Sequence, residues 1–298
     1  MVKLAIFTSS FTGELLLEGL LNKSIFPKIV TYKADFLRTS LSRDFSIFES
    51  FFEITYLNSN KYEDNKEILK KLNFDTALCI EWTKDFFANS VPPFNVYHTH
   101  PALLPFYRGY GAITEQFIQG VVKSGLTIYE NSIKIDGGNI VYQETINIDF
   151  NDYPEDFIKK YTSKIINFIE KMLSGELNLD TIKQNEDLSF YLVRKRNKNA
   201  IIDFNRDAYS IYNHIRGYSH PFFGAHFYFK DKKIKVFKSE IRAWQGYYGE
   251  PGVILEVKED YIDVACGTGM IRLNKLKQDE KSLENLDNIF EVNSKLNY

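Results

Sequence analysis

The chain has 298 residues, of which 44% are hydrophobic and 26% are charged, and its formal net charge is −2. This length suffices for one large domain or two ordinary ones, and the composition is typical of a globular protein. The small net charge argues against a protein that binds polyanions through bulk charge. With two isolated cysteines, no signal-peptide pattern and no stretch near the roughly 18 apolar residues of a membrane span, the sequence excludes a disulfide framework and a membrane protein. A reducing cytoplasm is the expected compartment.

Short apolar runs alternate with helical patterns through the first half of the chain. The runs predict strands at residues 3–7, 27–32, 76–80, 94–98, 125–129 and 140–148. Helical periodicity predicts helices at residues 13–21, 64–72 and 156–173. Such alternation favours an α/β domain with a mostly parallel sheet covered by helices.

A charged, polar stretch near residues 194–199 marks a change of pattern. A short helix is expected at 208–215, and short strands with glycine-containing and charged turns follow at 226–229, 234–238, 252–257, 261–265 and 270–276. Five such strands suggest a small β-barrel. We therefore expect an α/β domain at 1–190, a linker at 191–205 and a β-barrel domain at 206–298.

Two histidines end one of the predicted buried strands. His98 and His100 alternate with Thr99, so both imidazoles point to the same face of an extended chain. Ligands of parallel α/β sheets lie beyond the carboxyl ends of the strands. The pair is therefore a candidate for catalysis or for metal binding, although no local motif supplies a third zinc ligand, and we expect no metal.

A second signal is a carboxylate in a glycine-flanked loop just before another predicted strand. Asp136 stands in the sequence Ile-Asp-Gly-Gly-Asn-Ile at 135–140. Glycines of this kind let the backbone approach a ligand closely.

Together these segments resemble the folate-dependent formyltransferase family. The motif His-Pro-x-Leu-Leu-Pro-x-Tyr-Arg-Gly begins at His100, the Asp-x-Gly-x-Ile loop begins at Asp136, and the likeness continues through residues 215–225 and 251–269. The resemblance implies a Rossmann-like formyltransferase domain followed by an OB-like barrel. It also implies an enzyme that uses 10-formyltetrahydrofolate as co-substrate.

The family's catalytic set is an Asn, a His and an Asp. By resemblance, His100 is the catalytic histidine, which takes a proton from the attacking amine or steadies the reacting centre, and Asp136 orients its imidazole. The position of the Asn is occupied by His98. The Asn amide normally donates to the formyl oxygen, a contact worth about 3–4 kcal/mol of barrier. An imidazole N–H can also donate, with a different reach and direction.

The resemblance extends to the binding residues. It places the pterin near Trp82, Asp136 and Ile140, with most contacts from main chain. Arg108, the cation of the Tyr-Arg-Gly motif, is expected either to bind an anionic group of the substrate or to brace its loop.

Three hypotheses about the acceptor and the activity stay open. The favoured acceptor is a small-molecule amino-sugar nucleotide, a UDP- or dTDP-linked 4-amino sugar made for surface glycans, because the segment at 32–38 is short and not strongly basic and Tyr110-Gly-Ala112 departs from the motif's usual Ala-Ala-Pro. The alternative is methionyl-tRNA, which requires phosphate contacts and steep salt dependence. The second alternative is a catalytically altered member, suggested by His98. A homodimer is compatible with each of these.

Overall fold

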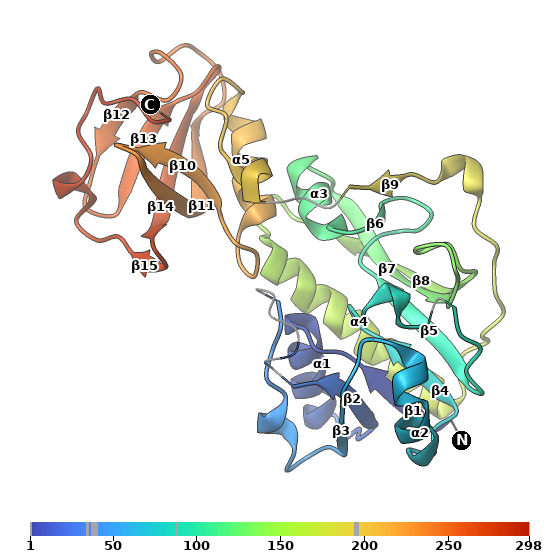
Figure 1. Ribbon diagram of the computed structural model, residues 1–298. Coiled ribbons are helices and arrows are strands. Elements are labelled where there is room, and N and C mark those ends of the chain that lie inside the picture. The colour runs from blue at the N-terminus through green and yellow to red at the C-terminus, as the bar shows by residue number, and fades with distance from the viewer. Residues whose placement is uncertain (1, 34–35, 37–40, 88, 194–196, 298) are drawn as a thin grey trace. The chain divides into compact units, whose positions relative to one another are not determined.

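The chain forms two compact units in the computed structural model, which describes residues 2–33, 36, 41–87, 89–193 and 197–297 (Figure 1). The first unit comprises Met1–Ala112, Val122–Phe150 and Asp156–Val193, and the second comprises Ile113–Val121, Asn151–Glu155 and Arg194–Tyr298. Two short pieces of the predicted first domain therefore belong to the second unit, which no sequence pattern indicated. Parts of the short segment at 32–38 and of the predicted linker lie outside the described residues, and the predicted domain ranges stay predictions.

The first unit is built on a seven-stranded sheet with the order β3-β2-β1-β4-β5-β7-β8. Its strands are β1 (Leu4–Phe7), β2 (Lys28–Tyr32), β3 (Ile54–Leu57), β4 (Thr76–Cys79), β5 (Asn95–His100), β7 (Lys123–Glu130) and β8 (Ile140–Asn147). The pairs among the first five strands are parallel, whereas β7 and β8 are antiparallel to their neighbours. This confirms the prediction of a mostly parallel α/β sheet. Of its strands, only β3 was not predicted.

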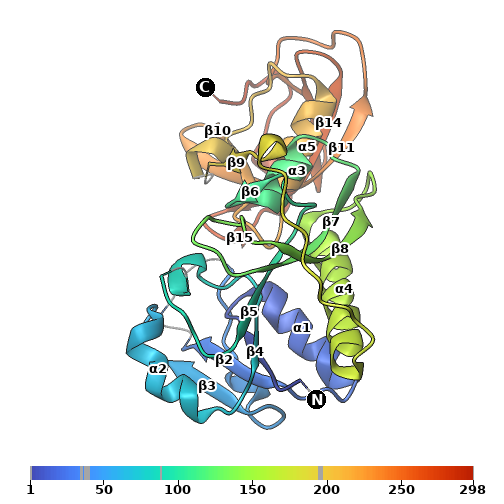
Figure 2. The same cartoon turned by 90° about the vertical axis from the view of Figure 1, so that its right-hand side faces the viewer.

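Helices cover both faces of this sheet. They are α1 (Phe11–Asn22), α2 (Tyr62–Lys71) and α4 (Pro154–Ser174). Figure 2 shows α1 and α4 on one side of the sheet and α2 on the other. A Cβ built on Gly19 of α1 would lie 2.3 Å from the Cδ1 atom of Ile166, so α1 packs closely on α4. The predicted apolar face of α4 is buried as expected: Ile158, Tyr161, Ile165, Phe168 and Met172.

The second unit is an antiparallel sheet with helices packed on it. The strand order is β10-β11-β14-β13-β12, with β15 paired to β14. The strands are β10 (Ala225–Phe229), β11 (Lys232–Ala243), β12 (Ile254–Val257), β13 (Tyr261–Ala265), β14 (Met270–Gln278) and β15 (Lys281–Ser282). Helix α5 (Ala208–Tyr218) buries Ile211 and Ile215 in the same core, and α3 (Ala112–Ile118) lies almost wholly in this unit. The predicted strands are confirmed, while closure into an OB-like barrel stays a prediction.

Shorter elements complete the described part of the chain. They are β6 (Arg108–Gly109), β9 (Tyr191–Leu192) and the 3₁₀ helices η1 (Ser46–Phe48), η2 (Lys84–Phe86), η3 (Glu186–Leu188), η4 (Asn197–Ala200) and η5 (Leu286–Asn288). No helix among the described residues has both the length and the apolar character needed to cross a membrane.

A buried histidine of the second unit makes stability depend on pH. His226 in β10 is 3% exposed, and burial, followed by Lys233, His214 and Lys235, lowers its pKa to about 4. In the unfolded chain a histidine ionises near pH 6.5, so between about pH 6.5 and 4 the unfolded state binds the extra proton. The free energy of unfolding should therefore decrease as the pH falls through this window.

His226→Phe removes the titrating group and keeps an aromatic ring beside Tyr228, which His226 contacts edge to face. We expect denaturant unfolding at pH 7 and pH 4.5 to show a smaller loss of stability in the variant than in the wild type. Equal losses in the two proteins would contradict the assignment.

Candidate active site

The two histidines of β5 converge on one buried cluster. His98 is 5% exposed and His100 is 2% exposed, and both lie at the carboxyl end of β5, between β4 and β7. The ring of His98 stacks on Tyr129 of β7 with 5.5 Å between centroids. His100 Nδ1 lies 3.4 Å from Asp136 Oδ2, and the Tyr129 hydroxyl donates to Asp136 Oδ1 over 2.5 Å. Strand alternation thus directs both imidazoles to the cluster around Asp136, as expected.

Asp136 is held by the loop that joins β7 to β8. Its φ of 52° is left-handed, a conformation that aspartate tolerates better than most residues. A Cβ at Gly138 would lie 1.8 Å from the carbonyl oxygen of Glu130, so only glycine allows this close approach. The carboxylate also accepts a hydrogen bond from the Gly109 amide over 2.7 Å. Burial, and then the Asp136 charge, raise the pKa of Tyr129 well above its usual range, so Tyr129 stays a donor.

The contacts of His100 match its charged form. The Nε2 atom lies 2.8 Å from the carbonyl oxygen of Tyr107, which can only accept, so Nε2 carries a proton. In a neutral ring, Nδ1 would then present its lone pair to the Asp136 carboxylate. A second proton on Nδ1 converts this repulsion into an ion pair. The pair is therefore suited to holding and passing on one proton.

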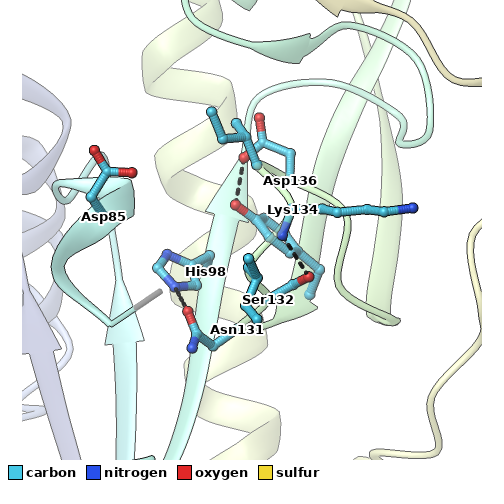
Figure 3. Close-up of a pocket in the computed structure, with 9 residues that line it drawn as sticks. Asp85, His98, Asn131, Ser132, Lys134 and Asp136 are labelled. Atoms are coloured by element: carbon cyan, nitrogen blue, oxygen red, sulfur yellow. Dashed lines mark hydrogen bonds between the residues drawn. The ribbon is translucent and has the colours of Figure 1, made fainter. Parts of the chain in front are cut away.

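The orientation of His98 is set by Asn131. The Asn131 Nδ2 atom donates to the carbonyl oxygen of Phe87 over 3.2 Å, which leaves Oδ1 to accept from His98 Nε2 at 3.1 Å (Figure 3). Because Nε2 carries the proton of the neutral ring, Nδ1 becomes a second donor only when the ring is charged. His98 can therefore replace a donating amide in only one of its protonation states.

A small pocket opens beside this cluster (Figure 3). It is lined by Asp85, His98, Tyr129 and the loop residues Asn131, Ser132, Ile133, Lys134, Ile135 and Asp136. Of the three residues expected at the pterin, Asp136 lines this pocket. Neither Trp82 nor Ile140 is among the residues that line it. Trp82 is 4% exposed and stacks on Tyr32 in the core, and the main chain of Ile140 is paired with that of Ile182. Within the described ranges, no group of three His, Cys, Asp or Glu side chains is placed to hold a metal ion.

Arg108 is fully buried and bonded to protein groups. Its guanidinium donates to Gln184 Oε1, to both carboxylate oxygens of Glu186 and to the Tyr191 hydroxyl over 2.8–3.1 Å. Of the two roles expected for Arg108, this geometry favours the brace over a contact with substrate.

Several residues of the cluster were not identified from the sequence. Tyr129 lies in β7 and Asn131 directly follows it, and both reach the site only because β7 pairs with β5. Gln184 lies in a polar stretch without any motif. Tyr129 had a usable signal, because it lies in the predicted strand at 125–129 and alternation along that strand places its side chain on the same face as that of Thr127.

Comparison with known proteins matches two families to successive parts of the chain. Residues 2–171 match the formyl transferase family, and residues 195–294 match the formyl transferase C-terminal domain. The chain therefore belongs to the formyl transferase family, which uses 10-formyltetrahydrofolate. This confirms the resemblance, the enzyme class and the co-substrate predicted from the motifs.

A methionyl-tRNA formyltransferase of Thermotoga neapolitana is 29% identical over 218 residues, which cover 71% of this chain and 68% of that protein. The match to the bifunctional polymyxin resistance protein ArnA of Wigglesworthia glossinidia brevipalpis, 30% identical over 210 residues, spans 32% of that protein, and the match to a methionyl-tRNA formyltransferase of Clostridium botulinum, 28% identical over 243 residues, spans 74% of that one.

Solved structures with low sequence identity share the fold. HypX from Aquifex aeolicus, in complex with tetrahydrofolic acid, is 12% identical with a TM-score of 0.69, covering 97% of this chain and 47% of that one. The N-formyltransferase from Helicobacter canadensis, in complex with folinic acid and dTDP-3-aminofucose, is 19% identical with a TM-score of 0.63, covering 93% of this chain and all of that one.

Proposed function

We propose that this protein transfers a formyl group from 10-formyltetrahydrofolate to the amine of an amino-sugar nucleotide. The observation that carries the transfer step is the buried contact between His100 and Asp136, whose Nδ1 and Oδ2 atoms lie 3.4 Å apart beside a pocket. Support for the acceptor comes from the near full-length likeness to the enzyme crystallised with dTDP-3-aminofucose and from the short segment at 32–38. Both cysteines are buried free thiols, in keeping with the reducing cytoplasm that we propose as the compartment.

The pocket is only about 10 Å³ and does not enclose a pterin ring in this structure, but its lining has the polarity to contact the edge of one. A pterin edge carries N–H donors and ring acceptors, which the Asp85 carboxylate and the main chain of residues 131–136 can complement. When bound there, the co-substrate supplies the formyl group. The protein's own residues then handle protons: as the amine nitrogen bonds to the formyl carbon, the neutral imidazole of His100 accepts the proton that the amine loses, and Asp136 stabilises the resulting imidazolium. The same proton passes to the folate nitrogen as its bond to the formyl carbon breaks, and tetrahydrofolate leaves. His98 is proposed as the donor that replaces the family's amide.

Methionyl-tRNA is the second candidate acceptor. The specific observation in its favour is the relative from Thermotoga neapolitana, 29% identical over 218 residues. A tRNA acceptor predicts a steep fall of kcat/KM with salt, because phosphate contacts release counterions, whereas a sugar nucleotide predicts a shallow one.

The experiment is a release assay with the purified protein. Tetrahydrofolate release from 10-formyltetrahydrofolate is followed against UDP- and dTDP-linked 3-amino and 4-amino sugars, and against charged initiator tRNA. Turnover with one sugar nucleotide supports the proposal, and turnover with tRNA alone replaces it by the second candidate. Folate binding without turnover on any acceptor favours a catalytically altered member of the family.

His98→Asn tests the unusual donor. We expect kcat of His98→Asn to stay at the wild-type level or to rise up to about tenfold, because the amide NH₂ group is a donor at any pH, whereas the imidazole gains its second donor only when it is charged. His98→Ala should lower kcat by on the order of 10²-fold. Steady-state kinetics of both variants check this. A complete loss in His98→Asn would mean that the site uses a donor geometry specific to the imidazole.

A further inference from the structure

A segment that follows helix α4 is hydrogen-bonded at both of its ends to main chain close to the candidate active site. This segment, residues 182–192, is called the strap below. At one end Ile182 exchanges two main-chain hydrogen bonds of 2.8 Å with Ile140, the first residue of β8. At the other end Tyr191–Leu192 forms β9, which pairs in parallel with Arg108–Gly109 of β6 (Figure 1). The strap thus joins the two loops that flank Asp136.

Gln184 is the buried strap side chain that reaches the Asp136 loop, whereas the exposed Glu186 contacts the same loop through an ion pair of 3.4 Å with Lys134. Gln184 is 4% exposed, while its neighbours Lys183 and Asn185 are exposed. Its Nε2 atom donates to the carbonyl oxygen of Asp136 over 2.8 Å and to that of Gly138 over 2.6 Å. Its Oε1 atom accepts from Arg108 Nη2 at 2.8 Å and from Nε at 3.1 Å. Both donors and both lone pairs of the amide are therefore used.

Arg108 fixes Gln184 from the other side. Its remaining donors bind the Glu186 carboxylate, at 3.0 and 3.1 Å, and the Tyr191 hydroxyl. The bond from Arg108 lowers the pKa of Glu186 to about 2, so this partner is charged at neutral pH. The next residue, Gly109, donates its amide to the Asp136 carboxylate over 2.7 Å. The main chain of Asp136 is thus held by Gln184, to which Arg108 donates, and its carboxylate is held by Gly109, the residue after Arg108.

We propose that Gln184 is a positioning residue: it sets the Asp136 carboxylate relative to His100, and Arg108 and Glu186 hold it in place. This inference rests on the proposed formyl transfer. It gives the Tyr-Arg-Gly arginine a positioning role instead of a substrate contact. It also explains why this arginine is buried and its guanidinium is directed at an amide and a carboxylate of the strap.

Gln184→Glu is the test because it conserves size and shape. The carboxylate still accepts from Arg108, but it faces the carbonyl oxygens of Asp136 and Gly138 without a donor. We expect kcat to fall about 10- to 100-fold, the scale of a small misplacement of catalytic groups, while KM for the folate stays within about threefold. The loss should shrink at low pH, because a protonated glutamic acid regains one O–H donor. Lys183→Ala, on the exposed side of the strap, is the matched control and should behave as wild type.

Hydrogen exchange gives a readout that needs no turnover. The Gly109 amide bonds directly to the Asp136 carboxylate, and the Ile140 amide bonds to Ile182. In Gln184→Glu we expect exchange at these two amides to rise about tenfold, with strands β1, β2 and β4 unchanged. Faster exchange throughout the first unit would overturn the positioning role and indicate general destabilisation instead. Unchanged exchange together with wild-type kcat would also overturn the positioning role.

Glu186→Ala is the second variant, used if Gln184→Glu does not fold. Glu186 is 44% exposed, so the substitution leaves the core intact, and we expect changes of about threefold at the same amides and in kcat. No change in either quantity would overturn the proposal. If the wild-type protein transfers formyl to no acceptor, the proposed function fails, and exchange at Gly109 still decides whether Gln184 holds the Asp136 loop.

Discussion

His100→Ala is expected to abolish formyl transfer, with kcat lowered by on the order of 10³-fold or more. The imidazole is the proposed proton carrier for the acceptor amine, and it is held on two sides, by the carbonyl oxygen of Tyr107 at 2.8 Å and by Asp136 at 3.4 Å. A methyl group supplies neither the proton nor the charge. A loss of this size corresponds to about 4 kcal/mol of barrier.

Single-turnover release of tetrahydrofolate, measured with saturating acceptor, checks this expectation. Binding of a folate that does not react should be retained, because His100 does not line the pocket. Tyr97→Phe is the matched control, since Tyr97 lies on the same strand but faces away from the cluster. If His100→Ala retains turnover near that of Tyr97→Phe, His100 is not the catalytic histidine.

The local framework of this site could be predicted from the sequence because it depends on short-range patterns. Alternation along β5 places His98 and His100 on one face, and the glycines after Asp136 indicate a tight loop. Strand β3 gave no such signal: Ile54-Thr-Tyr-Leu57 has only four residues, and three of them are half-buried. The antiparallel pairing of β7 and β8 also could not be read from their apolar patterns.

The positioning contacts could not be predicted because they join distant parts of the chain. Gln184 bonds to groups 48 and 76 residues earlier in the sequence, and no period or spacing links them. Trp82 illustrates the converse problem. A large aromatic residue after a strand suits a ligand pocket or a core equally well, and here the ring stacks on Tyr32 with centroids 4.4 Å apart.

Asp136→Asn is expected to lower kcat by about 10³- to 10⁴-fold while KM for the folate changes little. The Gly109 amide can only donate, so the asparagine must turn its oxygen toward Gly109 and toward His100. Its NH₂ group then faces the Tyr129 hydroxyl, which can accept. The shape and the hydrogen bonds of the loop therefore persist, and the variant removes mainly the charge opposite His100.

The pH dependence separates this loss of charge from a loss of structure. A carboxylate beside an imidazole favours the charged ring, so its removal makes the ring lose its second proton at lower pH. The limb of the pH–rate profile that reports loss of this proton should move to lower pH by roughly one unit or more in Asp136→Asn. A uniform fall of kcat without displacement of that limb would mean that Asp136 acts by holding the loop. Wild-type kcat in this variant would show that the His100–Asp136 pair is not used in formyl transfer.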